Sequence, residues 1–103
     1  MAVLWTDEAL DNIAAIYAYI AKDSPYHAGR FTDAMMESVE EQIELSPLIG
    51  FMLPEANDPN LRCIIYRGYR IIYHIQGERI YIKLAEHGAR ELTDSRAEEL
   101  LNI

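Results

Sequence analysis

The segment that most constrains the fold is 61–75, LRCIIYRGYRIIYHI. Two apolar runs rich in Ile and Tyr flank Arg67-Gly68, and glycine readily takes the positive φ that a two-residue hairpin turn requires. The segment therefore predicts antiparallel strands over 61–66 and 69–75. A second glycine turn leads into another apolar run, 79–86, so we expect a meander of three strands.

The residues before this meander predict a strand and two helices. Residues 3–5, VLW, can form a short strand, and Thr6 can then cap a helix over about 7–22. Ser24-Pro25 begins a second amphipathic helix, because the first helical position leaves its N–H unbonded and proline has none. Ser46-Pro47 ends that helix.

Two segments remain. Residues 47–60 contain three prolines and one glycine, which is typical of a connecting loop, and 93–101 can form a short helix capped by Thr93. The order β-α-α-β-β-β predicts one α+β domain over 1–103. We expect a helical hairpin packed on one face of a small antiparallel sheet, and a short C-terminal helix can follow.

Alternation along the strands sorts side chains by face. In 69–75 the residues at odd positions are Tyr and Ile, whereas the even positions are Arg70, Ile72 and His74. In the last strand we expect Ile80, Ile82 and Leu84 to oppose Tyr81, Lys83 and Ala85. The pattern predicts one apolar face under the helices and an uncovered face on which cationic side chains gather.

The charge is unevenly distributed. The net charge is -8, which argues against direct nucleic-acid binding because such binding neutralises phosphates. Residues 1–58 hold two basic against eleven acidic residues, whereas 61–83 hold five basic residues against Glu78 alone. An acidic half is thus joined to a locally basic sheet.

Cysteine and histidine usage narrows the class of protein further. Cys63 is the only cysteine, so no internal disulfide can form, which fits a cytoplasmic protein. His27, His74 and His87 lack the paired spacing of a metal site, so we expect no metal and no cofactor. We also expect no signal peptide, because Asp7 and Glu8 come before any apolar run long enough for an h-region. We expect no membrane contact, because no apolar run approaches the ~18 residues of a membrane span.

The ordered segments resemble the ParE/RelE superfamily of toxin–antitoxin toxins. LWTDEALDNIAAIYAYIA, SPYHAGRF, LSPLIG with LPE behind it, LRCIIYRGYRIIYHI and IYIKLAEHGARE occur in the family's order over about residues 3–92. The resemblance implies a toxin held inactive in a hetero-oligomer with its antitoxin. We expect that antitoxin to add a strand at the sheet edge or a helix in a groove, with acids facing the arginines.

The superfamily divides by activity. RelE-like members cut mRNA on the ribosome, whereas ParE-like members are associated with inhibition of DNA gyrase. LWTDEALDNI, SPYHAGRF and SPLIG look more like the ParE side, which implies gyrase as the target and no catalytic centre. A ribosome-dependent endoribonuclease and a derived binding module without toxicity remain the alternatives.

Five residues are candidates for the target-binding surface: Arg62, Arg70, Lys83, His87 and Arg90. An endoribonuclease would instead use Arg62 and Arg90 as cations at the phosphorane and His87 as acid or base. The segment GFMLPEANDPN before the sheet lacks Lys and Arg, which weighs against that reading. The structural alternatives stay open: the arginines can pair with nearby glutamates, and His87 can bond the backbone at a strand end.

Overall fold

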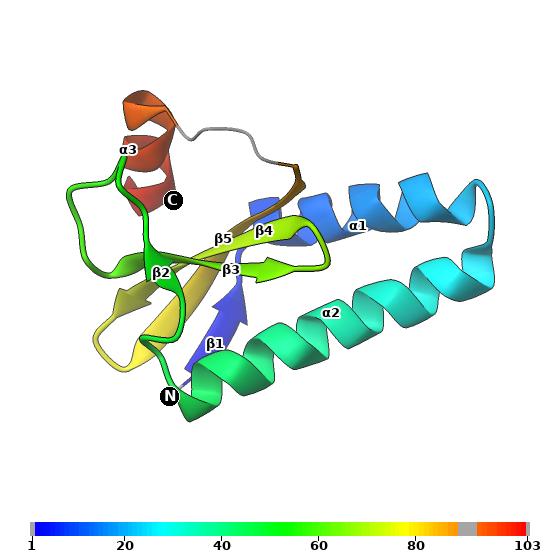
Figure 1. The fold of residues 1–103 in the computed structure, drawn as a ribbon, viewed down its shortest axis with the longest axis horizontal. Coiled ribbons are helices and arrows are strands. Elements are labelled where there is room, and N and C mark those ends of the chain that lie inside the picture. Colours follow the sequence, from blue (N-terminus) through cyan, green and yellow to red (C-terminus); the bar gives the residue numbers. More distant parts are fainter. Residues whose placement is uncertain (1, 89–92, 103) are drawn as a thin grey trace.

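The computed structural model describes residues 2–88 and 93–102. The elements along the chain are β1 (Ala2–Trp5), α1 (Asp7–Ala21), α2 (Pro25–Leu45), β2 (Phe51–Met52), β3 (Leu61–Tyr66), β4 (Tyr69–Gln76), β5 (Arg79–His87) and α3 (Asp94–Asn102). The α+β class, the helical hairpin on the sheet and the short C-terminal helix are confirmed (Figure 1).

The predicted helix starts are confirmed by their capping bonds. The Thr6 hydroxyl accepts a hydrogen bond from the Ala9 N–H at 3.2 Å, and the Ser24 hydroxyl accepts one from the His27 N–H at the same distance. Pro25 occupies the first helical position of α2. Each cap satisfies an N–H that the first turn of a helix leaves without an internal partner.

The sheet has five strands in the order β1-β5-β4-β3-β2, and it is mixed. The expected antiparallel pairing holds for β3–β4 and β4–β5, and the unexpected strand β2 also pairs antiparallel with β3, but β1 runs parallel to β5. Side-chain alternation assigns residues to the two faces of a sheet but does not say whether two strands are parallel or antiparallel. The direction of β1 relative to β5 depends on where the helical hairpin returns the chain to the sheet. The edge strand β2 lies inside the segment 47–60 that was expected to be a loop.

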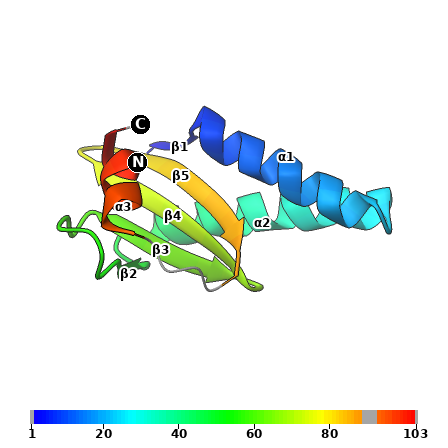
Figure 2. The ribbon, with the colours of Figure 1, turned by 90° about the horizontal axis from the view of Figure 1, so that it is seen from above.

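Both faces of the sheet are partly covered. The larger core lies under the hairpin and includes Ile13 and Ile16 of α1, Val39 of α2 and Tyr73 of β4. A smaller core on the other face joins α3 to the sheet and comprises Leu53, Leu61, Cys63, Ile72, Leu84, Ala97 and Leu100. Figures 1 and 2 show α3 near one end of the sheet and the hairpin extending past the opposite end.

A β-bulge changes the alternation of β5. Ile72 lies opposite Leu84 while Tyr73 lies opposite Ile82, so Lys83 is an extra residue in β5. The predicted grouping of Leu84 with Ile82 is therefore wrong. Leu84 packs in the smaller core and the next residue, Ala85, packs under the hairpin, because the inserted residue shifts the period-two pattern by one.

Candidate functional site

Arg62 lies on the helix-facing side of β3, opposite Tyr73. Its guanidinium donates to three main-chain carbonyls: Nε to Pro59 at 2.9 Å, and Nη1 to Leu48 at 3.3 Å and Gly50 at 2.9 Å. These bonds fix the chain before and after β2 onto the sheet. The guanidinium of Arg62 therefore stabilises the loop that contains the edge strand β2.

Arg70 lies on β4 and Lys83 lies on β5. Arg70 lies opposite Glu86, and its Nη2 meets the Glu86 Oε1 at 3.2 Å. The Lys83 side chain is fully buried, with Nζ 5.4 Å from the centre of the Tyr81 ring, and burial lowers the pKa of its ammonium. The expected gathering of cations on one uncovered face is therefore wrong, because Arg62 lies on the helix-facing side of the sheet and the Lys83 side chain is buried. Arg90 lies outside the described residues.

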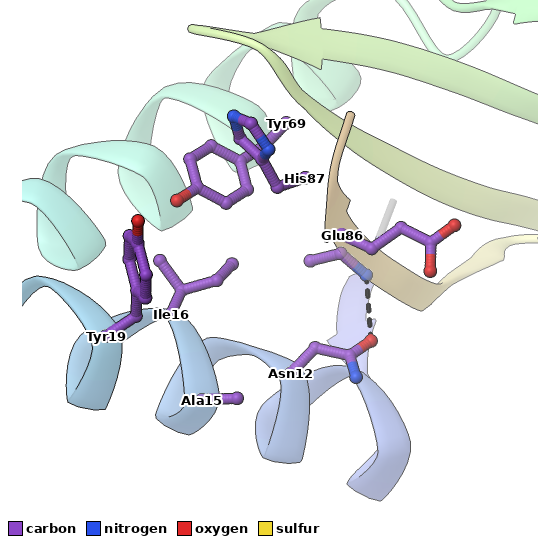
Figure 3. Close-up of a pocket in the computed structure, with 8 residues that line it drawn as sticks. Asn12, Ala15, Ile16, Tyr19, Tyr69, Glu86 and His87 are labelled. Atoms are coloured by element: carbon purple, nitrogen blue, oxygen red, sulfur yellow. Dashed lines mark hydrogen bonds between the residues drawn. The ribbon is translucent and has the colours of Figure 1, made fainter. Parts of the chain in front are cut away.

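Among the candidates, His87 borders a groove. Its ring meets the Tyr69 ring edge-on, with centres 4.9 Å apart, and it is exposed to solvent. The groove has a volume of about 490 Å³ between α1 and the ends of β4 and β5. Figure 3 shows Tyr19 and Ile16 rising from α1 toward Tyr69 and His87. The lining residues are Asn12, Ala15, Ile16, Tyr19, Tyr69, Ala85, Glu86 and His87.

The groove opens where β1 stops and β5 continues. β1 pairs with β5 only as far as Ile82, whose carbonyl accepts hydrogen bonds from the Thr6 N–H at 3.0 Å and the Thr6 hydroxyl at 2.9 Å. Further along β5, the Asn12 carboxamide oxygen accepts the Ala85 N–H at 3.0 Å (Figure 3). A side chain of α1 thus replaces the missing strand and satisfies a main-chain donor that would otherwise lack a partner.

Tyrosines and cations gather around the same end of the molecule. Three of the cations that lie over tyrosine rings are at this end: Lys22 over Tyr19 at 5.6 Å, Arg30 over Tyr26 at 5.5 Å, and Arg67 over Tyr66 at 5.9 Å. A second hollow of about 400 Å³ lies between α2 and the β3–β4 turn, and its lining includes Arg30, Tyr66 and Arg67. We call these six residues, with the His87 groove, the tyrosine–cation end. It contains both basic residues of the acidic half, Lys22 and Arg30.

The sequence reasoning missed most of this end. Tyr19 and Tyr26 are 69% and 66% exposed, and large aromatic residues on the polar side of a helix were the available signal. Asn12 was also missed, although it is a polar residue beside the apolar stripe of Ile13 and Ile16. The groove itself depends on where β1 ends against β5, and local patterns do not contain that information.

Of the proposed nuclease residues, Arg62 and His87 are not brought together. Arg62 lies opposite Tyr73 and His87 lies opposite Tyr69, four residues away along β4. At ~3.3 Å per residue and ~4.8 Å per strand spacing, their backbones are about 16 Å apart.

Among residues 2–88 and 93–102, no group of three His, Cys, Asp or Glu side chains is placed to hold a metal ion. No helix in this described part has the length and apolar character to cross a membrane.

Comparison with known proteins gives one family and several similar structures. Residues 3–92 match the family model of the ParE toxin of type II toxin-antitoxin system, parDE. A solved structure described as the chromosomal ParDE TA system from P. aeruginosa has a TM-score of 0.70 at 22% identity, over 86% of this chain and 97% of that chain. The YoeB/ParE toxin from Agrobacterium tumefaciens has a TM-score of 0.51 at 14% identity, over 86% of this chain and 100% of that one. These structural likenesses show the fold, and no curated protein sequence matches.

Proposed function

The chain belongs to the ParE toxin family, and on this premise we propose that it inhibits DNA gyrase by binding it and is neutralised by direct contact with a cognate antitoxin. Both partners are proteins that it meets in the cytoplasm, and the neutralised form is a hetero-oligomer. Its action is protein binding, without cleavage of a substrate.

The tyrosine–cation end carries this proposal. Tyr and Arg are enriched among the residues that dominate the energy of protein interfaces. Here Tyr19 and Tyr26 are largely exposed, and each already has a cation over its ring. Because these contacts restrain the side chains before binding, less conformational entropy is lost when a partner covers them.

The alternative, an mRNA endoribonuclease, fits the geometry less well. Arg62, one of the two cations that the nuclease reading needs, donates to three carbonyls and helps to hold the edge strand. A net charge of -8 also disfavours approach to the ribosome, which is a polyanion. Protein contact through the opposite end uses side chains that have no comparable structural role.

The test is inhibition of gyrase supercoiling by the purified protein. We expect the double variant Tyr19→Ser/Tyr26→Ser to require at least ~10-fold more protein for the same inhibition, since one interface hot spot contributes ~2 kcal/mol or more. Leu10→Ser is the matched control, because it removes a large exposed side chain from α1 away from the groove lining. Full supercoiling activity at saturating wild-type protein, or cleavage of ribosome-bound mRNA, would exclude the proposal.

A further inference from the structure

The hollow of about 400 Å³ where the β3–β4 turn approaches α2 has the character of a small-molecule site (Figure 1). Such sites typically have volumes of ~300–1,000 Å³ and a mostly apolar lining with a few polar groups. The apolar lining here includes Ile20, Phe31 and Tyr66, and the basic lining is His27, Arg30 and Arg67. Among the described residues that line it, none is acidic. We call it the Arg30–Arg67 hollow.

The two arginines of this hollow are not neutralised by a carboxylate. In the described part of the chain every ion pair uses other basic residues, and Asp33, one turn along α2 from Arg30, does not line the hollow. The sequence has 17 acidic against 9 basic residues, so a lack of acids does not explain this. A guanidinium has five N–H donors, and Arg30 uses one of them on the Tyr26 hydroxyl. Donors therefore remain for an anion from outside the chain.

The turn itself does not account for an arginine at position 67. Arg67 has a φ of 46°, and among the described residues it is the one residue other than glycine with a positive φ. The first position of such a turn favours Asn, Asp or Gly, and a long side chain is disfavoured there. Backbone strain of this kind is found most often at functional sites. The observation therefore points to a role for the Arg67 side chain beyond forming the turn.

The apolar part of the hollow indicates that the anion also has an aromatic part. Phe31 meets Tyr66 edge-on with ring centres 5.9 Å apart, and both side chains are partly buried, so the rings are held in place. A nucleobase can lie against such rings, and phosphate oxygens accept strong hydrogen bonds from guanidinium groups. A nucleotide joins these two halves in one molecule.

We propose that the Arg30–Arg67 hollow binds a nucleoside di- or triphosphate, with its phosphates at Arg30 and Arg67 and its base against Tyr66 and Phe31. A nucleic-acid strand fits less well, because a net charge of -8 repels a long polyanion. The inference goes beyond the proposed function and does not rest on it, since it concerns the protein in the absence of gyrase.

Titration calorimetry of the purified protein with ATP tests the inference. The buffer contains no magnesium, so that no other cation competes for the phosphates. We expect saturable binding, at least ~10-fold tighter than that of adenosine or of pyrophosphate, because each of these lacks one of the two halves that the hollow contacts. The affinity for ATP should also fall as salt is raised, since the contact includes exposed charges.

Variants locate the binding. Arg67→Asn should weaken ATP binding at least ~10-fold while the Tm stays equal or rises, because asparagine suits a positive φ better than arginine does. Arg30→Gln should weaken binding by a similar factor and leave α2 intact, since the two residues have similar helix propensities. Arg79→Gln is the matched control. Arg79 is an exposed arginine beside the other hairpin turn, at the opposite end of β4, and the substitution should leave ATP binding unchanged.

Three results would overturn the inference: no saturable binding of ATP, equally tight binding of adenosine or pyrophosphate, or an equal effect of Arg79→Gln. A short single-stranded DNA that binds more tightly than ATP would also overturn it and assign the hollow to nucleic acid. The gyrase assay separates this inference from the proposed function. ATP binding by a protein that leaves gyrase active would refute only the proposed function, and gyrase inhibition by a protein that binds no ATP would refute only the inference.

Discussion

The Tyr73 hydroxyl joins the loop before β2 to the centre of the sheet. It accepts the Gly50 N–H at 2.9 Å and donates to the Pro47 carbonyl at 2.7 Å, and the Tyr73 side chain is fully buried. Tyr73→Phe retains the ring and removes only the oxygen. The substitution therefore isolates the two hydrogen bonds from the packing of the core.

The expected cost follows from the groups left without partners. A buried donor or acceptor that loses its partner costs ~1–3 kcal/mol. The Gly50 N–H is buried, whereas the Pro47 carbonyl is partly accessible and can recover a bond to water. We expect a loss of about 2–3 kcal/mol, a large share of the ~5–15 kcal/mol that stabilises a typical domain.

Urea unfolding followed by circular dichroism measures this loss, and Tyr26→Phe is the control. Tyr26 also loses a hydroxyl contact, an acceptor for Arg30 Nη1 at 2.8 Å, but at an exposed site where changes stay within about 0.5 kcal/mol. If Tyr73→Phe unfolds within about 0.5 kcal/mol of the wild type, the loop is not held by this hydroxyl and the reasoning fails.

Three further predictions concern the same half of the molecule. Gly50→Ala should destabilise the fold by ~1–3 kcal/mol in thermal melts, because the new Cβ would lie 2.8 Å from Tyr73 side-chain atoms and 2.9 Å from the Cys63 carbonyl; an unchanged Tm would contradict this. Burial raises the pKa of the Cys63 thiol to about 11, so a disulfide reagent at pH 7.5 should react only after unfolding, and rapid reaction of the folded protein would count against it. The Asn60 N–H, followed by His74, lowers the pKa of Asp58 below its ordinary value of 3.8. Its stabilising effect is therefore complete above that value and is lost as pH falls through the lower folded-state pKa. Asp58→Ala should lose less stability than the wild type between pH 5 and pH 2, and parallel pH curves would refute the assignment.

Local chemistry in the sequence was sufficient for the helices and the central hairpin. Thr6 and Ser24 are capping residues by type, and Arg67 and Gly68 both adopt positive φ, 46° and 85°, as the two-residue turn requires. In these cases the residues that determine the local structure are neighbours in the chain. The order of the elements, and hence the fold class, follows from them.

The features that escaped prediction depend on contacts between distant segments. The bulge at Lys83 cannot be seen in β5 alone, because an inserted residue is defined only against the partner strand β4. Likewise, β2 forms because Arg62 and Tyr73 hydrogen-bond to main-chain carbonyls of the segment 47–60 and hold it against the edge of the sheet, although that segment is rich in proline. The same limit applies to the candidate site. Alternation along the strands grouped Arg62 with the other cations of the sheet, but the carbonyls to which Arg62 donates lie outside β3, and the strand pattern does not reveal them.

Plasmid topology after induction tests the central proposal most directly. Cells that express the protein without an antitoxin are sampled over time, and plasmid topoisomers and ribosome-bound mRNA are measured in the same culture. We expect negative supercoiling to fall while the mRNA remains intact, and Tyr19→Ser/Tyr26→Ser to delay that fall. Normal supercoiling in growth-arrested cells with cleaved mRNA, or unimpaired growth with the protein present, would contradict inhibition of gyrase by protein contact.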